Sequence, residues 1–130
     1  MHTARRFRRE VPEIPRSRRF VADVLAKCGR DASDAVLLVA SELVTNAVRH
    51  GNGDVELRIA VNDGNVRLEV LDDGHVKVRA PRRTPAPTAV GGRGLHLVRD
   101  VSRRWGSGFD PAGRTLVWAE MPAGGGRVGP

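Results

Sequence analysis

The sequence has a single cysteine, no tyrosine, few other aromatic residues and no long apolar run. Cys28 has no second cysteine with which to form an internal disulfide, and the clustered Cys and His residues of a zinc site do not surround it in the sequence. No stretch approaches the roughly 18 to 20 apolar residues of a membrane-spanning helix. The arginine-rich start is not followed by the apolar segment of a secretory signal, so we expect a soluble cytoplasmic protein in which Cys28 is a packing residue.

Positive charge is concentrated at the N-terminus. The net charge is +7, and residues 1–30 account for six of these charges because they hold nine Arg or Lys residues and three acidic ones. The remaining residues are nearly balanced, so only the N-terminal edge, residues 1–14, is expected to be basic. Direct nucleic-acid binding through this edge is the least favoured function, because the scarcity of aromatic residues leaves little for stacking on bases.

The length of 130 residues and an apolar content of 40% suit one modest domain. We expect this domain to span residues 1–122 and residues 123–130 to form a disordered tail, because a Gly-rich terminus without apolar anchors cannot offset its ordering entropy. Helical periodicity predicts one helix over residues 17–28. It predicts a second, longer helix from a cap at Asp31 or Ser33 to His50, with Gly51 as its stop.

Alternation of apolar and polar residues predicts strands after this helix. Two strands, residues 55–61 and 66–70, are joined at a tight turn formed by Asp63 and Gly64. Weaker patterns predict four further elements. These are an edge strand over residues 4–11, a short helix over 95–101, and strands over 104–109 and 115–121. The order of elements predicts an α/β fold, a two-layer sandwich with helices on one face of a mostly antiparallel sheet.

Three polar side chains recur at every fourth position along one flank of the second predicted helix: Glu42, Asn46 and His50. They border the apolar stripe that we expect to face the core. The stripe consists of Val36, Leu37, Ala40, Leu43, Val44 and Ala47. At such a border a carboxylate or amide is half-covered and can still reach a ligand. On an arbitrary helix, however, a row of this kind is more often a polar border than a site, so the row alone is weak evidence for a binding site.

The segment Ser41 to Gly51, read as S-E-L-V-T-N-A-V-R-H-G, resembles the N-box of the ATPase superfamily of histidine kinases, gyrase and MutL-type repair proteins. Within that superfamily it resembles the serine-kinase anti-sigma factors and their small actinobacterial relatives. The resemblance implies a Bergerat-type ATP site in which Glu42 is a general base and Asn46 binds the Mg²⁺ that bridges the phosphates. These roles suit the chemistry of a carboxylate and an amide oxygen. His50 is either a helix C-terminal cap or a ligand contact.

A second segment, Asp72-Asp73-Gly74, follows the strand that ends at Leu71 and resembles the family's D-x-G element. The resemblance implies that Asp72 accepts a hydrogen bond from the adenine amino group, and Gly74 allows the backbone to approach the base. Without the family, such a segment is usually a simple turn. The sequence departs from the family at Val76, where a second glycine is often found.

A third segment, Gly91-Gly92-Arg93-Gly94-Leu95, resembles the family's G-x-G-L box. The resemblance implies that Gly92, Arg93, Gly94 and Leu95 bind nucleotide, because a helix N-terminus offers backbone N–H groups and a positive dipole end to phosphate. The loop before it, about residues 75–93, matches the lid that closes over nucleotide, and its basic residues are phosphate contacts or solvated surface groups. These are Lys77, Arg79, Arg82 and Arg83. Thr115, in a segment resembling the family's threonine-containing strand, is expected to support the adenine aspartate.

The resemblance implies an Mg-ATP-binding regulatory protein that acts as a protein-serine kinase in transcription regulation. It would phosphorylate a small antagonist protein and bind a sigma factor, and dimerisation is left open. The alternative is a non-catalytic module that binds ATP and acts only by docking a partner. A sensor histidine kinase is disfavoured because no histidine lies on a predicted phosphoacceptor helix. The histidines are His2, His50, His75 and His96.

Overall fold

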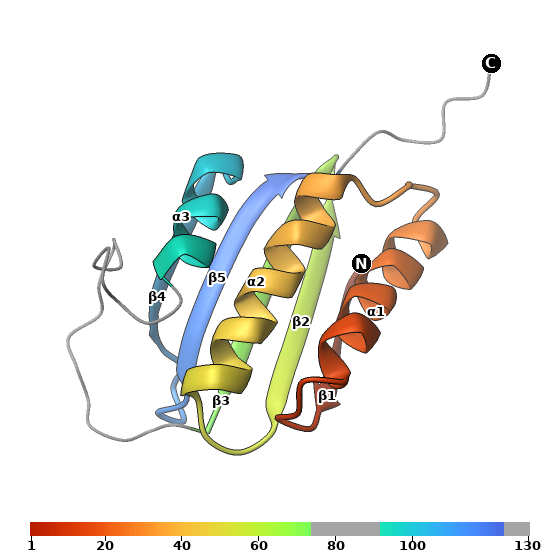
Figure 1. The fold of residues 1–130 in the computed structure, drawn as a ribbon. Helices are drawn as coiled ribbons and strands as arrows, with labels where there is room; N and C mark the ends of the chain where they lie inside the picture. Colours follow the sequence, from red (N-terminus) through yellow and green to blue (C-terminus); the bar gives the residue numbers. More distant parts are fainter. Residues whose placement is uncertain (74–91, 124–130) are drawn as a thin grey trace.

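A computed structural model describes residues 1–73 and 92–123, with residues 92–95 described by their backbone alone. Within these residues, five strands form one sheet in the order β1-β2-β3-β5-β4, and every neighbouring pair is antiparallel. Three helices cover one face of this sheet (Figure 1). The elements are β1 (His2–Phe7), α1 (Glu13–Lys27), α2 (Asp34–His50), β2 (Val55–Asn62), β3 (Asn65–Asp72), α3 (Gly92–Val101), β4 (Arg104–Phe109) and β5 (Thr115–Pro122). The predicted α/β fold is therefore confirmed.

The helix α2 lies over the middle of the sheet and packs against α1, α3 and strands β2, β3 and β5. Of the two predicted caps, Ser33 is the one used, because its Oγ accepts a hydrogen bond from the Val36 N–H at 3.1 Å. This bond satisfies one of the N–H groups that lack a partner in the first turn of a helix. The helix ends at His50, as the sequence predicts.

The hairpin of β2 and β3 forms where the sequence predicts it. Asn62 pairs with Asn65, and the two residues between them have positive φ angles, 45° at Asp63 and 79° at Gly64. Two positive φ angles define the turn whose twist matches that of antiparallel strands, and Asp-Gly is a preferred sequence for it. The turn holds the register in which the alternating apolar side chains of both strands face the helices.

Three elements begin two or more residues before the position predicted from the sequence. The edge strand spans His2–Phe7 instead of residues 4–11, because its register is set by pairing with β2. The helix α1 begins at Glu13, four residues before the first position predicted, and Pro15 is accommodated in its first turn, where a proline N–H is not needed. The helix α3 begins at Gly92 instead of residue 95, so Gly92 and Gly94 lie within its first turn.

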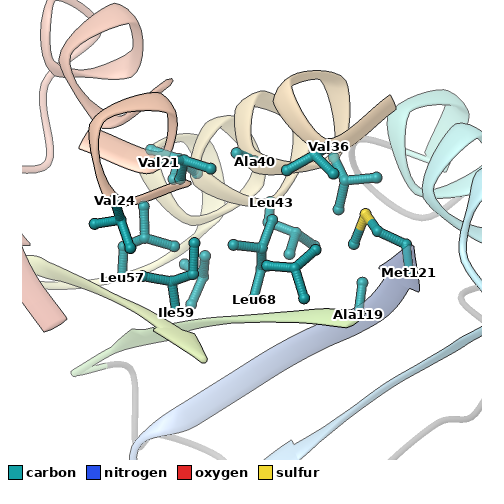
Figure 2. Packing of buried hydrophobic residues seen from close by; sticks show 14 of the residues in the cluster. Val21, Val24, Val36, Ala40, Leu43, Leu57, Ile59, Leu68, Ala119 and Met121 are labelled. Carbon is teal, nitrogen blue, oxygen red and sulfur yellow. The ribbon is translucent and has the colours of Figure 1, made fainter. Parts of the chain in front are cut away.

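The core lies between the helices and the covered face of the sheet (Figure 2). Side chains from α1 and α2 meet those of the central strands, and Leu25, Leu43, Leu57 and Leu68 are each at most 1% exposed. Burial of this kind contributes roughly 1.5–3 kcal/mol for each large aliphatic side chain. The core extends to Ala123, the first residue of the expected tail, whose N–H donates to the Gly64 carbonyl at 2.7 Å. Residues 124–130 lie outside the described residues.

No helix within the described residues is long and apolar enough to cross a membrane.

Candidate functional site

Glu42 and Asn46 are half-buried on α2, as expected for the border of its buried stripe, whereas His50 is exposed at the end of the helix. Leu43, Val44 and Ala47 face the core beside them. Successive members of the row are separated by about 6 Å along the helix axis. The row therefore leads from the middle of α2 to its C-terminal end. Partial shielding of the exposed ring from water, with a smaller effect from the charge of Arg49, lowers the pKa of His50 below its ordinary value.

Asp72 ends strand β3 at the same end of the domain. It is 7% exposed, one of two polar side chains within the described residues that are classed as buried. In the strand register it lies between Val55 on β2 and Thr115 on β5. Opposed residues of antiparallel strands project from the same face of the sheet, so Thr115 is placed beside Asp72 on the covered face. This is the position expected from the sequence for a residue that supports the Asp72 carboxylate.

Gly51 connects the end of α2 to Asp72. Its φ of −89° and ψ of −173° are extended values that any residue adopts, so a left-handed cap is not the reason for glycine here. A Cβ at this position would lie 2.6 Å from the Ala47 carbonyl oxygen and 2.7 Å from the Asp72 Cγ and Oδ2 atoms. The next residue, Asn52, donates its N–H to Asp72 Oδ1 at 3.5 Å. The backbone after α2 thus packs directly on the carboxylate.

Sequence reasoning treated Gly51 only as a helix stop and missed this contact, because no local pattern shows which side chain a glycine will face. It also missed Arg9, whose Nη1 donates to the Val48 carbonyl at 3.2 Å and so satisfies a carbonyl in the last turn of α2. Arg6 was likewise missed, although its guanidinium lies 3.9 Å from an oxygen of Asp73. The basic N-terminal edge therefore supports the end of the sheet at which Asp72 lies.

The N-terminus of α3 is directed toward this same end of the sheet (Figure 1). It packs against α2, and its first residue is Gly92. The backbone N–H groups of a first helical turn point toward the helix N-terminus, which makes that end favourable for an anion. Gly94 and the backbone of Arg93 and Leu95 belong to this turn. The other predicted residues of the lid and of the glycine-rich segments, including Gly74, lie outside the described residues.

The fold therefore brings four predicted elements of the site to one end of the domain. They are the row on α2, Asp72, Thr115 and the N-terminus of α3. A buried carboxylate beside a glycine that leaves no room for a Cβ provides a rigid acceptor next to a backbone surface. Such a carboxylate can accept a hydrogen bond from an amino group, and the α3 N-terminus suits phosphate. This combination of groups fits a nucleotide.

A charged cluster lies on the opposite face of the sheet at this end. Arg114 Nη1 donates to Glu56 Oε1 at 3.0 Å, and Arg114 Nε donates to Asp110 Oδ2 at 2.9 Å. Burial raises the pKa of Glu56, but hydrogen bonds from Arg58 and Arg114 offset it and leave the pKa below its ordinary value. Burial likewise raises the pKa of Asp110, but the backbone and side-chain hydrogen bonds from Arg114 lower it by more, so the pKa is below its ordinary value. Both carboxylates are therefore stabilised in their charged form.

This cluster predicts acid sensitivity. Because the folded pKa values of Glu56 and Asp110 are lowered, their stabilising effect is present above the unfolded values, near pH 4, and is lost as pH falls through the folded values. Urea unfolding of the wild type should thus show a lower midpoint at pH 3.5 than at pH 7, and Arg114→Leu should reduce this difference. Arg99→Ala is the control, because Arg99 and Asp100 form an exposed pair that contributes little. An undiminished difference in Arg114→Leu would contradict the assignment.

Comparison with known proteins agrees with this geometry. The family profile of the histidine kinase-like ATPase domain matches residues 7–118, which is most of the chain. The chain belongs to this family, and the family assignment supports ATP binding. No curated protein matches the chain in a comparison of sequences.

Proposed function

We propose that this protein is an Mg-ATP-dependent protein-serine kinase of the anti-sigma type, which phosphorylates a small antagonist protein and binds a sigma factor in the cytoplasm. One observation carries the proposal. The flank of α2 that bears Glu42 and Asn46 ends at Gly51, which packs on the buried carboxylate of Asp72. The flank of α2 therefore presents a candidate base and then a candidate magnesium ligand, and it leads to a candidate adenine acceptor at the end of β3.

In this proposal Asp72 binds the adenine end of ATP. Its carboxylate accepts a hydrogen bond from the adenine amino group, and Thr115 supports the carboxylate from the neighbouring strand. The close packing of Gly51 and the N–H of Asn52 limit the movement of this carboxylate. An acceptor that is already held in place loses little conformational entropy when the base binds, which favours affinity.

The phosphates would extend from Asp72 toward Asn46 and the N-terminus of α3. The amide oxygen of Asn46 is the kind of hard ligand that Mg²⁺ prefers, and phosphate oxygens and water would provide the others. The bound ion would neutralise negative charge on the phosphates. The first-turn N–H groups of α3, which include that of Gly94, would hold phosphate oxygens in position.

Glu42 would act on the protein substrate. Its carboxylate accepts the proton of the serine hydroxyl while the serine Oγ forms a bond to the γ-phosphorus and the bond to the β-phosphate oxygen breaks, which leaves ADP and phosphoserine. Glu42 is half-buried one helical turn before Asn46, so it lies beside the proposed magnesium site. The proposed site therefore contains a proton acceptor near the atoms that react.

Substitution of Glu42 tests this role. We expect Glu42→Gln to lower phosphoryl transfer by about 100- to 10,000-fold while leaving ATP affinity unchanged, because the amide keeps the shape of the side chain and cannot accept the proton. The measurement is transfer of label from γ-labelled ATP to serine of the antagonist protein, with ATP affinity determined in parallel. Asp34→Asn, which removes an exposed carboxylate from the first turn of the same helix, is the matched control.

Two further outcomes decide between the kinase and the non-catalytic alternative. Thermal stabilisation of the wild type by Mg-ATP, lost in Asn46→Ala, combined with labelled serine would support the kinase. The same stabilisation with no labelled serine, although antagonist binds, would reject the kinase and leave a partner-docking module. Equal transfer by wild type and Glu42→Gln would reject the proposed role of Glu42.

A further inference from the structure

The face of the sheet opposite the helices has an ordered pattern of charged side chains. The helices within the described residues all cover the other face (Figure 1). The uncovered face is defined here by the outward-facing positions of four strands. They are Glu56, Arg58, Ala60 and Asn62 on β2, Asn65, Arg67, Glu69 and Leu71 on β3, Leu116, Trp118 and Glu120 on β5, and Arg104, Gly106 and Gly108 on β4.

Arginine and glutamate side chains alternate across this face and form a row of ion pairs. Arg67 is central, because its Nε lies 2.8 Å from Glu69 Oε2 and its Nη1 lies 2.7 Å from Glu120 Oε2. Arg104 approaches Glu120 Oε1 at 3.5 Å from the edge strand β4. Burial lowers the pKa of Arg67, and its hydrogen bonds to both glutamates raise it above the ordinary value. Arg67 is therefore fixed, whereas the side chain of Arg104 remains 71% exposed.

Trp118 lies flat on the sheet among these ion pairs. Its ring covers Gly106, where a Cβ would lie 3.0 Å from three ring atoms. The guanidinium of Arg67 stands 4.2 Å from the ring centroid, and that of Arg104 stands 5.7 Å from it. Both distances are within the range of cation–π attraction. The result is a rigid aromatic surface that is half-exposed and bordered by two positive charges.

A pocket of about 450 Å³ opens at the end of the sheet that carries the β2–β3 turn, and two of its lining residues, Arg67 and Arg104, are the arginines that border Trp118. Its volume is within the range of small-ligand sites, roughly 300–1,000 Å³. Ala60 has a short side chain between longer neighbours, and Arg103 closes the rim by donating to Asn65 Oδ1 at 3.0 Å. The pocket is lined by Ala60, Asn62, Asp63, Asn65, Val66, Arg67, Arg103, Arg104 and Glu120.

This pocket is separate from the nucleotide site. Strand β3 begins at the pocket with Asn65 and ends at the nucleotide site with Asp72, so the two sites are about 23 Å apart along the strand. They also involve opposite faces of the sheet. Binding at this pocket is therefore independent of the proposed kinase activity.

The charges indicate what would bind. Arg103, Arg104 and Asp63 are exposed on the rim, while Glu120 is already paired with both Arg67 and Arg104. The two exposed arginines outnumber the one exposed carboxylate of the lining, so a second copy of this chain, with its net charge of +7, is disfavoured here. We propose that the pocket binds an acidic segment of a partner protein. Arg103 and Arg104 would pair with its carboxylates, and Trp118, which Arg104 borders, would sense the binding.

The experiment uses Trp118 as the reporter. Trp105 and Trp118 are the two tryptophans of the sequence, so a full-length Trp105→Phe protein reports emission from Trp118 alone. The probe is hexaglutamate with acetylated and amidated ends, compared with hexaglutamine of the same length. We expect saturable quenching or shifting of the emission by hexaglutamate alone. Arg103→Ala/Arg104→Ala in this background should weaken the affinity by at least about tenfold, because two charge-assisted contacts are lost.

The matched control is Arg16→Ala/Arg19→Ala, which removes the same charge from exposed positions on α1. Retained affinity in the control, with ATP affinity equal in all variants, would support the pocket. Equal loss in both double variants would overturn the proposal in favour of general charge attraction. Absence of saturable hexaglutamate binding, or tighter binding of oligothymidylate with the same dependence on Arg103 and Arg104, would also overturn it. So would a dimer in sedimentation that Arg103→Ala/Arg104→Ala dissociates.

Discussion

Asp72→Asn is expected to lower the affinity for ATP by about 10- to 100-fold, because a hydrogen bond to a charged acceptor contributes about 1.5–3 kcal/mol. The carboxylate only accepts hydrogen bonds, whereas the amide of asparagine also presents two donors to the adenine amino group. Guanine has a carbonyl where adenine has that amino group. The preference for ATP over GTP should therefore fall together with the affinity for ATP. Equilibrium binding of fluorescent analogues of both nucleotides measures both quantities.

Asp73→Asn is the control for this substitution. It makes the same chemical change one residue later, at a side chain that is 43% exposed and lies 3.9 Å from Arg6. Affinity for ATP should remain near that of the wild type in this control. Unchanged affinity and unchanged base preference in Asp72→Asn would show that Asp72 does not contact the base.

Gly51→Ala is expected to cost both stability and nucleotide affinity. The new Cβ would lie 2.6 Å from the Ala47 carbonyl oxygen and 2.7 Å from the Asp72 carboxylate, so the loop after α2 or the carboxylate has to move. Overpacking of this kind typically lowers the free energy of unfolding by about 1–3 kcal/mol. Urea unfolding measures the loss of stability. Titration with ATP should show weaker binding, because Asp72 can no longer keep its position.

Gly29→Ala separates the two effects. Gly29 has a φ of +75°, and a Cβ there would meet nothing within 4 Å, so its substitution causes backbone strain without a steric clash. The strain should cost about 1–2 kcal/mol of stability. Gly29 follows α1, whose C-terminal end lies away from the end of β3 that carries Asp72 (Figure 1), so ATP affinity should be retained. If Gly51→Ala kept full ATP affinity, the contact between Gly51 and Asp72 would have no part in binding.

Local patterns predicted the central elements of the fold well. The alternation in β2 and β3 and the Asp63-Gly64 turn are short-range signals, and they determine the hairpin because the turn sets its register. The apolar stripe and the Ser33 cap determine α2 in the same way. These elements also carry Glu42, Asn46 and Asp72, so most of the candidate site could be recognised before its geometry was known.

Boundaries that depend on distant partners were predicted poorly. The arginine-rich start has little alternation, and β1 takes its limits from β2, with which Phe7 and Val55 are paired. The start of α1 was missed because Pro12 and Pro15 suggest a break, whereas the first turn of a helix tolerates proline. The start of α3 was missed because glycines are weak helix formers, and here α3 packs against α2.

By itself the sequence determined the order of elements, the central hairpin and the residue types of the candidate site, because periodicity, caps and turns act over a few residues. Tertiary structure decided which distant residues meet. It placed Gly51 against Asp72, and it placed Arg67 and Arg104 around Trp118 beside a pocket on the uncovered face. Those contacts join residues from different strands and loops, and their proximity follows from strand order and register, which no local pattern encodes.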